Sequence, residues 1–353
     1  MKNRKAIINE FGTSAVIKII EEEIPEPKAG EARIRIEAST VSATDIFIRK
    51  GIYPLLKEKP PFTLGYDFVG IVDKVGEGVY NIKVGARVCS IVMICGNAEY
   101  ICTNAIELTV IPKDIDTTAA ACLTLSGITA YQMFKHVAKV KNGQRILVHG
   151  GSGAIGNTLI QLGRLINCTI IATASSTKHP LIESYGAISV DYKSSVYFAR
   201  LKELAADGFD AVFDFTNQKS FNQSFKLLKK GGTLVTYAVF SSSLKIEKKT
   251  FANFMSFGMD FGLMMLKLAI WNALPNGKYA QFYGSTDYKK DNRLQHQQDM
   301  NELFELVYKG FLKPHIHSIL NLADVKLAHE MLQSGKVQGQ LILKTETDSV
   351  AVK

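Results

Sequence analysis

Apolar and polar residues alternate through much of residues 1–123, with the period of two that marks strands having one buried face. The alternation is clearest in 32–40, where isoleucine and alanine interleave with arginine and glutamate. Stretches 69–75 and 87–94 are further predicted strands, and glycines mark the turns between them. Many short strands separated by turns predict a compact β-rich module.

Beyond residue 123 the chain alternates between apolar strands and helices. Strands are predicted over 145–149, 169–174, 187–192, 209–215 and 233–239, with a further one over 281–285. The helices between them are predicted over 153–166, 180–185, 196–206 and 220–228. Alternation of this kind is typical of a parallel, doubly wound sheet in an α/β protein.

The pattern changes again after residue 290. A helix is predicted over 300–308, and Asp324 is the predicted N-cap of a second helix that ends near Gly335. The final predicted strand, 340–344, has no parallel partner unit of its own. It could therefore pair back with the N-terminal β-rich module.

Length and composition agree with two domains. A chain of 353 residues is long enough for both, and 46% hydrophobic with 21% charged residues excludes a disordered or collagen-like chain. We assign 1–123 and 290–353 to one domain and 124–289 to the other. Within the second domain, 240–289 is an expanded segment.

Cysteine usage and the apolar stretches bear on where the protein works. Five cysteines with irregular spacing and no Cys-x-x-Cys pair predict a reducing, cytoplasmic location. No signal peptide is expected, because the N-terminal residues run directly into a strand-like stretch. The most apolar stretch, 254–274, contains Asp260 and Lys267, which are costly at the centre of a bilayer, so it is not predicted to cross a membrane.

The formal net charge of +9 favours anionic ligands, such as a phosphorylated cofactor, a nucleic acid or an acidic membrane. The charges are dispersed, however, and no run of five like charges occurs. An ordinary basic surface is therefore the favoured explanation. We therefore predict no specific nucleic-acid partner.

A glycine-rich turn is the strongest local motif. Gly151, Gly153 and Gly156 form a G-x-G-x-x-G that follows a predicted strand and opens a predicted helix, the context of dinucleotide binding. The N–H groups of Ala154 and Ile155 would face a pyrophosphate at the positive end of that helix. The alternative is a glycine-rich turn without a ligand.

The residues after the second strand bear on which dinucleotide binds. An NAD site needs an acidic residue there, and 172–178 contains none. Ser175 and Lys178 would instead suit a 2′-phosphate, and Tyr192 could donate a further hydrogen bond. We predict NADP(H) rather than NAD(H). The alternative for Lys178 is an ordinary solvated lysine.

Several segments together resemble one protein family. The chain is similar to the medium-chain dehydrogenase/reductase superfamily, in its zinc-independent quinone oxidoreductase group, which includes zeta-crystallin-like and vesicle-amine-transport-like proteins. The resemblance implies a Rossmann domain beside a GroES-like catalytic domain. It spans nearly the whole chain and is weakest over 240–292. The matching segments are 41–51, 65–70, 97–100, 117–131, 148–153 and 335–343.

The resemblance also predicts that no metal is bound. Alcohol dehydrogenases of this superfamily hold a catalytic zinc at three positions that here carry Ser42, Tyr66 and Leu125. None of these is a usual zinc ligand. The closely spaced cysteines of the structural zinc lobe are missing as well.

Without a metal, an already electrophilic acceptor is easier to reduce than an alcohol is to oxidise. Quinones and α,β-unsaturated carbonyls accept hydride at a conjugated carbon, and the developing oxyanion then needs only hydrogen-bond donors. The candidate donors are Ser42, Tyr53 and Tyr66, of which we favour Tyr53. Both tyrosines have an alternative reading as packing residues.

Further cofactor contacts are implied by the resemblance and by strand ends. Ser126 and Thr129 would lie beneath the nicotinamide, or alternatively cap the interdomain helix. Asn217, Tyr237 and Phe240 follow the fourth and fifth strands of the parallel sheet, where ligands bind. They could flank the nicotinamide ribose.

The expanded segment contains an apolar stripe at helical spacing. Three interpretations are open: a core or dimer surface, a lid over the cleft, and, less favoured, a helix that touches a membrane peripherally. Relatives often pair sheet edges at the sixth strand, so the resemblance implies a homodimer. The members of the stripe are Phe254, Phe257, Phe261, Met264, Met265, Leu268 and Trp271.

The function predicted from the sequence is an NADPH-dependent quinone or enone reductase. The alternative is a non-catalytic or moonlighting dinucleotide-binding protein that associates with RNA or a membrane. An alcohol or aldehyde reductase is disfavoured by the missing metal ligands.

Overall fold

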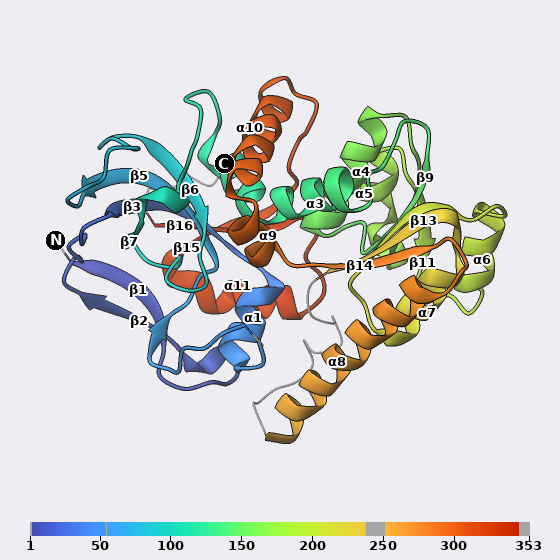
Figure 1. Ribbon diagram of the computed structural model, residues 1–353. Helices are drawn as coiled ribbons and strands as arrows, with labels where there is room; N and C mark the ends of the chain where they lie inside the picture. Colours follow the sequence, from blue (N-terminus) through green and yellow to red (C-terminus); the bar gives the residue numbers. More distant parts are fainter. Residues whose placement is uncertain (1, 54, 238–250, 346–353) are drawn as a thin grey trace.

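The computed structural model describes residues 2–53, 55–237 and 251–345 (Figure 1). Phe240, a predicted cofactor contact, lies outside the described residues. Two units lie side by side, a β-rich one at the left of Figure 1 and an α/β one at the right. The α/β fold class predicted from the sequence is confirmed.

The β-rich unit contains a seven-stranded sheet of order β15-β16-β3-β5-β6-β8, with β7 paired to β3. A smaller sheet of order β2-β1-β4 packs beside it. The bounds are β1 (Asn3–Ile8), β2 (Ile17–Glu22), β3 (Glu31–Val41), β4 (Phe62–Thr63), β5 (Asp67–Val75), β6 (Arg87–Ile91), β7 (Tyr100–Asn104), β8 (Thr109–Val110), β15 (Ile316–Asn321) and β16 (Gln340–Lys344). Helix α1 (Ala43–Lys50) follows β3, and α11 (Val325–Gln333) connects β15 to β16.

The α/β unit is built on a six-stranded parallel sheet of order β11-β10-β9-β12-β13-β14, the strand order of the Rossmann fold. Its strands are β9 (Arg145–His149), β10 (Thr169–Ala174), β11 (Ile188–Asp191), β12 (Phe209–Asp214), β13 (Leu228–Tyr237) and β14 (Tyr279–Tyr283). Its helices are α4 (Ala154–Leu165), α5 (His179–Ser184), α6 (Tyr197–Leu204), α7 (Gln218–Lys226) and α8 (Phe251–Ala273). Both faces are buried, since Ile146 and Leu147 of β9 belong to different hydrophobic clusters.

Helical segments join the two units. A run formed by α2 (Thr117–Cys122), a π-helical turn, α3 (Ile128–Gln132) and a second π-helical turn leads into β9. After β14 come α9 (Ser285–Asp291) and α10 (Arg293–Tyr308). Lys289 of α9 reaches the β-rich unit, where its Nζ donates to Ser90 Oγ at 3.0 Å and pairs with Glu107 at 3.0 Å. The bounds of the two domains stay a prediction.

Some sequence expectations need correction. The last strand does have a parallel partner, because the unpredicted β15 pairs with β16, which also pairs antiparallel with β3 as expected. Strand β13 begins at Leu228 rather than 233, since the expected Gly231–Gly232 turn lies inside the strand at a register irregularity. Asp324 is the N-cap residue of α11, as predicted, but its side chain makes no capping hydrogen bond; in the turn just before it, Asn321 accepts from the Ala323 N–H.

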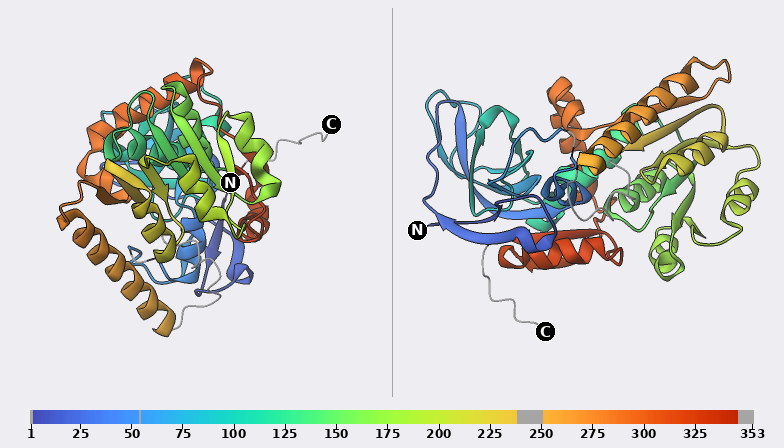
Figure 2. Two further views of the ribbon diagram at one scale, coloured as in Figure 1. Left: turned by 90° about the vertical axis from the view of Figure 1, so that its right-hand side faces the viewer. Right: turned by 90° about the horizontal axis from the view of Figure 1, so that it is seen from below.

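Helix α8 extends away from the body of the molecule (Figure 2). Several stripe residues face inward: Met264 and Leu268 are buried, and Trp271 stacks on Phe225 at 4.3 Å between ring centroids. Met265, another member, is exposed. The packing of Met264, Leu268 and Trp271 agrees with the core interpretation. Among the described residues, we find no helix with both the length and the apolarity to cross a membrane.

Candidate functional site

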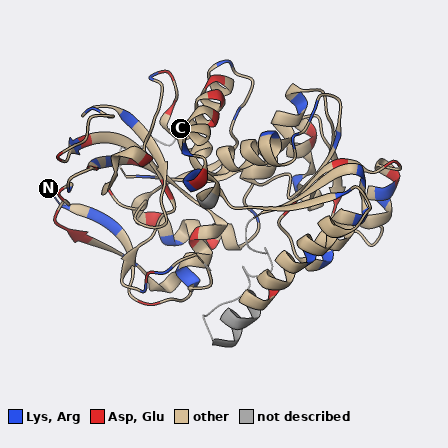
Figure 3. Cartoon of the chain, viewed as in Figure 1, with Lys and Arg blue, Asp and Glu red and all other residues tan. Residues whose placement is uncertain are grey.

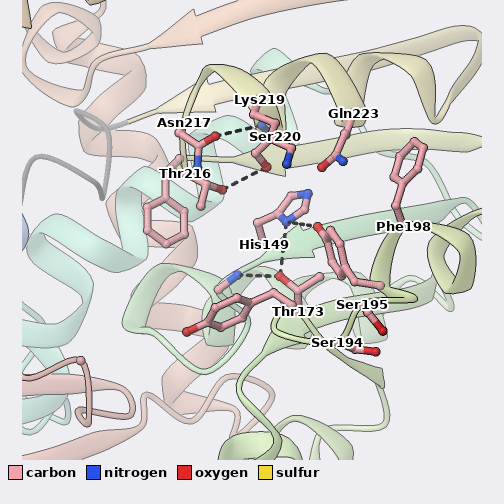
Figure 4. A pocket seen from close by; sticks show the side chains of 15 residues that line it. His149, Thr173, Ser194, Ser195, Phe198, Thr216, Asn217, Lys219, Ser220 and Gln223 are labelled. Atoms are coloured by element: carbon pink, nitrogen blue, oxygen red, sulfur yellow. Dashed lines mark hydrogen bonds between the residues drawn. The ribbon is translucent and has the colours of Figure 1, made fainter.

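A cavity of about 630 Å³ lies at the carboxyl ends of β9, β10 and β12 (Figure 4). In a doubly wound sheet this is where nucleotides bind. Hydroxyl groups and aromatic rings dominate its lining, which is formed by His149, Gly150, Thr173, Tyr192, Ser194, Ser195, Tyr197, Phe198, Phe215, Thr216, Asn217, Lys219, Ser220, Gln223 and Gly335.

Four glycines in and beside the motif have different structural roles. The left-handed turn is made by Gly150, with φ +68°, which precedes the predicted motif. A Cβ on Gly151 would meet the Cβ of Ala172 at 2.7 Å, and one on Gly156 would meet the Gly150 carbonyl oxygen at 2.3 Å. Both glycines therefore let helix α4 approach the sheet. Gly153 has only ordinary contact, with its nearest atom at 3.4 Å, so a ligand could approach its backbone.

The N-terminus of α4 begins directly after this turn. Gly153 is its N-cap, and Ala154 and Ile155 are its first residues, so their N–H groups have no acceptor within the helix. Such groups and the helix dipole favour an anion. This arrangement fits the pyrophosphate of a dinucleotide.

The residues predicted to read a 2′-phosphate lie around the β10 end. Tyr192 is 54% exposed and lines the cavity. Ser175 and Lys178 are not among the described residues that line it. Lys178 Nζ donates to the carbonyl oxygens of Gly335 at 2.7 Å and Val337 at 2.8 Å, and burial lowers the pKa of this lysine.

A buried network behind this cavity was missed by sequence reasoning. Asp214 Oδ2 accepts from Ser220 Oγ at 2.6 Å and from Ser224 Oγ at 2.7 Å. His149 Nε2 lies 3.0 Å from Ser224 Oγ. Asn217, predicted near the ribose, accepts from the Ser220 N–H as the N-cap of α7. The network holds the strand ends that shape the cavity.

A second cavity, of about 190 Å³, lies between the two units. It brings together residues that the sequence nominated separately for substrate and cofactor. Its lining comprises Ser42, Ala43, Thr44, Tyr53, Leu55, Tyr66, Leu125, Ser126, Thr129, Ile155, Tyr237, Phe261, Phe282, Tyr283, Gly284 and Ser285. Ile155 places the first turn of α4 in its wall, next to the glycine motif.

Hydroxyl groups form a chain in this second cavity. Tyr53 OH lies 3.0 Å from Tyr66 OH, and the two rings meet edge to face. Tyr66 is buried and its hydroxyl also forms a hydrogen bond with Thr286 Oγ1 of α9. Thr286 carried no sequence signal, because only the tertiary fold brings α9 back to the β-rich unit. Such a chain can hold a proton beside a ligand.

Three other predicted residues have structural partners. Ser42 donates its hydroxyl to Asp45 at 2.7 Å and its N–H at 2.8 Å in the capping box of α1. Ser126 Oγ donates to Gln340 Oε1 of β16 at 2.8 Å. Tyr237 is buried against Phe215, and burial raises its pKa far above the usual range. The tyrosine pair is therefore the better source of a donated proton than Ser42.

The positions that hold zinc in alcohol dehydrogenases also line this cavity, and here they are Ser42, Tyr66 and Leu125. Across the described residues there is no group of three His, Cys, Asp or Glu side chains placed to hold a metal ion. The two acids nearby serve the local structure: Asp45 caps α1, and Asp67 accepts from the Thr40 N–H at 2.7 Å and from Thr40 Oγ1 at 2.5 Å.

We expect Asp67 to make the fold less stable as the pH rises from about 4 to 7. Burial raises its pKa to about 7, whereas an unfolded aspartate titrates near 4, so between these values the native state binds the additional proton. By pH 7 the accumulated loss amounts to on the order of a few kcal/mol of stability, and it changes little at higher pH. Urea unfolding at pH 5 and pH 8 should show a smaller loss for Asp67→Asn than for the wild type. Parallel pH profiles would refute this.

Comparison with known proteins identifies the family. Residues 28–144 match the alcohol dehydrogenase GroES-like domain, and residues 186–343 match the family described as zinc-binding dehydrogenase. The chain is 27% identical over 346 residues to the synaptic vesicle membrane protein VAT-1 homolog of Danio rerio, covering 97% of this chain and 70% of that protein. It spans only 59% of the human VAT-1 homolog-like protein.

Two further similarities cover nearly the whole length of both chains. The quinone oxidoreductase of Rattus norvegicus is 28% identical, with 95% of each chain covered. A mycobacterial protein solved in complex with NADPH superposes with a TM-score of 0.81 at 26% identity, covering 97% of this chain and 100% of that one. The chain belongs to the medium-chain dehydrogenase/reductase superfamily, within its zinc-independent quinone oxidoreductase group, and is an oxidoreductase.

Proposed function

We propose that this protein uses NADPH to reduce quinones or α,β-unsaturated carbonyl compounds. The observation that carries the proposal is the second cavity, where the Tyr53–Tyr66–Thr286 hydroxyl chain lies beside the first turn of α4. A relative named quinone oxidoreductase and a relative solved with NADPH support the choice of substrate and cofactor.

The residues of the two cavities fit a bound dinucleotide. The α4 N–H groups of Ala154 and Ile155 would bind the pyrophosphate, and the hydroxyl-rich first cavity would hold the adenosine end. When bound, NADPH supplies a hydride. Ser126, Thr129 and Tyr237 line the second cavity, where they would restrain the nicotinamide end.

The protein itself would contribute a hydroxyl group that is placed to donate a proton to the acceptor. Hydride addition to a conjugated carbon leaves negative charge on the acceptor oxygen, and a hydroxyl donor within reach stabilises it. Tyr53 OH can donate its proton to that oxygen, and Tyr66 OH can then pass a proton to Tyr53. Thr286 Oγ1, which is partly exposed, would return a proton to Tyr66 and take one up from solvent. The apolar lining from Leu55, Leu125 and Phe282 keeps water away from the reacting atoms.

The test follows NADPH absorbance with purified protein and a panel of quinones and enones. Turnover of at least one acceptor that is lost in Tyr53→Phe is the expected result. Tight NADPH binding without turnover of any acceptor would refute the proposal and favour a non-catalytic dinucleotide-binding protein. The cytoplasmic location expected from the cysteines stays a prediction.

Cofactor choice has its own expected result. Lys178→Ala should weaken NADPH binding roughly 10- to 100-fold, the worth of a hydrogen bond to a charged group, and change NADH binding little. The Lys178 ammonium has three donors, of which the Gly335 and Val337 carbonyls use two. Isothermal titration with both cofactors measures the ratio. Lys326→Ala, an exposed lysine of α11 that lines neither cavity, is the matched control, and equal losses for both cofactors in Lys178→Ala would contradict the assignment.

A further inference from the structure

Helix α8 contributes an aromatic wall to the second cavity. Phe261 of α8 and Phe282 of β14 both line the cavity, and their rings meet edge to face with 5.3 Å between centroids. Phe261 is partly buried. Both residues lie in 240–292, where the resemblance to the family is weakest. The resemblance therefore does not predict this wall.

Hydrogen bonds to the parallel sheet and its helices hold α8 beside the cavity. Gln218 of α7 donates its Nε2 to the Asp260 carbonyl oxygen at 3.0 Å and accepts from Lys267 Nζ at 2.8 Å. One side chain thus binds α8 on both sides of Phe261 in the sequence. Asn272, near the end of the helix, makes two further hydrogen bonds of 2.8 Å with the backbone of β14. The ring of Phe261 is therefore fixed as part of the cavity wall.

The second cavity is small for a ligand site. Its volume of about 190 Å³ lies below the roughly 300–1,000 Å³ of pockets that bind drug-sized ligands. Under the proposed function the nicotinamide end of the cofactor would share this space, restrained by Ser126 and Thr129. An acceptor that reaches Tyr53 then has to fit into the space that remains, which Phe261 helps to bound.

The cavity lining is uncharged and rich in aromatic rings. Among the described residues that line it there is no Asp, Glu, Lys, Arg or His. Figure 3 shows most of α8 without charge, and its two charged residues, Asp260 and Lys267, are absent from the described lining. Burial of an ionic group without a partner is costly, so the lining suits an uncharged acceptor. Its Tyr and Phe rings suit a planar one.

We propose that the second cavity selects uncharged, planar acceptors with a single ring, and that Phe261 of α8 sets the limit on their size. This inference rests on the proposed function, because that function places the acceptor beside Tyr53. A single-ring quinone would accept one hydride and one proton there and become a hydroquinone, while NADPH becomes NADP⁺. Truncation of Phe261 would open the cavity toward α8 and admit quinones with fused rings.

An acceptor series of increasing ring number tests the size limit. The kcat/KM of each variant with 1,4-benzoquinone, 1,4-naphthoquinone and 9,10-phenanthrenequinone is divided by the wild-type value, so that the intrinsic reactivity of each quinone cancels. Phe261→Ala should raise this ratio at least tenfold for the two larger quinones relative to benzoquinone, because one methylene in an apolar pocket is already worth about 10- to 200-fold. Phe261→Trp should lower it for naphthoquinone.

Two further variants control for loss of packing. Met265→Ala, at an exposed position of the same helix outside the described cavity lining, should leave the three ratios equal. Phe261→Leu changes the packing less than alanine does and should shift the ratios in the same direction. It decides the result if the alanine variant melts below the assay temperature. Equal ratios for all three quinones in both Phe261→Ala and Phe261→Leu would overturn the size limit.

The charge preference is tested in Phe261→Ala, whose cavity should admit two fused rings. This variant should reduce 1,4-naphthoquinone with at least a tenfold higher kcat/KM than 1,4-naphthoquinone-2-sulfonate. Addition of Leu55→Lys, at a partly exposed position of the lining, should narrow that preference, because the ammonium group can pair with the sulfonate. Equal use of the neutral and the anionic quinone by Phe261→Ala would overturn the charge preference.

Isothermal titration without NADPH separates this inference from the proposed function. The probe is 2,3-dimethyl-1,4-naphthoquinone, whose substituted ring positions prevent addition to cysteine thiols. Phe261→Ala should bind it at least tenfold more tightly than the wild type. If this difference is found but no quinone is turned over, the proposed function fails and the size limit stands. If quinones are turned over but neither the rate ratios nor the affinities differ in Phe261→Ala, the size limit fails and the proposed function stands.

Discussion

Gly156→Ala is expected to weaken dinucleotide binding about 10- to 100-fold and to lower the melting temperature. Its Cβ would lie 2.3 Å from the Gly150 carbonyl oxygen and 2.8 Å from Gly151 Cα. Both are backbone atoms of the turn, so α4 or the turn has to move. Overpacking of this kind costs about 1–3 kcal/mol of folding stability. Displacement of the turn or of α4 would also misplace the N–H groups that face the pyrophosphate, and each 1.4 kcal/mol lost there is about tenfold in affinity.

Gly153→Ala is the matched control for this effect. Its Cβ has its nearest neighbour, the Gly150 oxygen, at an ordinary 3.4 Å, so the protein without cofactor should melt like the wild type. The methyl group nevertheless enters the space where a pyrophosphate would approach, so NADPH affinity should still fall. Fluorescence titration with NADPH and thermal melting measure both properties. A Gly156→Ala protein that binds and melts normally would show that α4 does not depend on this close approach.

Tyr53→Phe is expected to lower kcat on the order of 100-fold, the usual effect of removing one donor to a developing oxyanion, with NADPH affinity unchanged. The substitution keeps the ring and hence the edge-to-face contact with Tyr66 at 6.0 Å between centroids. It removes only the hydroxyl that lies 3.0 Å from Tyr66 OH. Steady-state kinetics with the best quinone or enone acceptor give the result.

Two further variants distinguish proton donation by the tyrosine hydroxyls from packing of their rings. Tyr66→Phe breaks the hydroxyl chain at its buried centre and should lower kcat nearly as much. Thr286→Val removes only the far partner of Tyr66 and should cost about fivefold, as for one neutral hydrogen bond of about 1 kcal/mol. If Tyr53→Phe turns over like the wild type, the tyrosines are packing residues, which was the alternative at the level of sequence.

Most of the α/β unit was predictable because its signals are local. The bounds of β9 and β10 were predicted to the residue, since apolar runs bounded by turn residues specify parallel strands without help from distant segments. The β-rich unit was harder to predict from the sequence. Strand β15 went unnoticed because its residues are only partly buried and its pairing with β16 depends on a crossover through α11.

The site was predictable in its parts but not in its assembly. Motif spacing identified the glycines of the turn, yet the left-handed position at Gly150 and the close approach at Gly156 depend on backbone geometry. Tyr53 and Tyr66 were nominated individually, whereas their hydrogen bond and the contribution of Thr286 required the structure. Ser126 has a partner, Gln340, that no local pattern indicated, whereas Ser42 pairs with Asp45 three residues on, in a capping box.

The sequence by itself determined the order of strands and helices in most of the α/β unit, the glycine-rich turn and the absence of usual zinc ligands at the family's positions, because each of these depends on neighbouring residues. Only the tertiary structure decided which hydroxyls meet in the second cavity and which face of α8 stays exposed. Those outcomes depend on segments more than 200 positions apart, such as Tyr66 and Thr286, that are brought together when the apolar surfaces of the two units are buried.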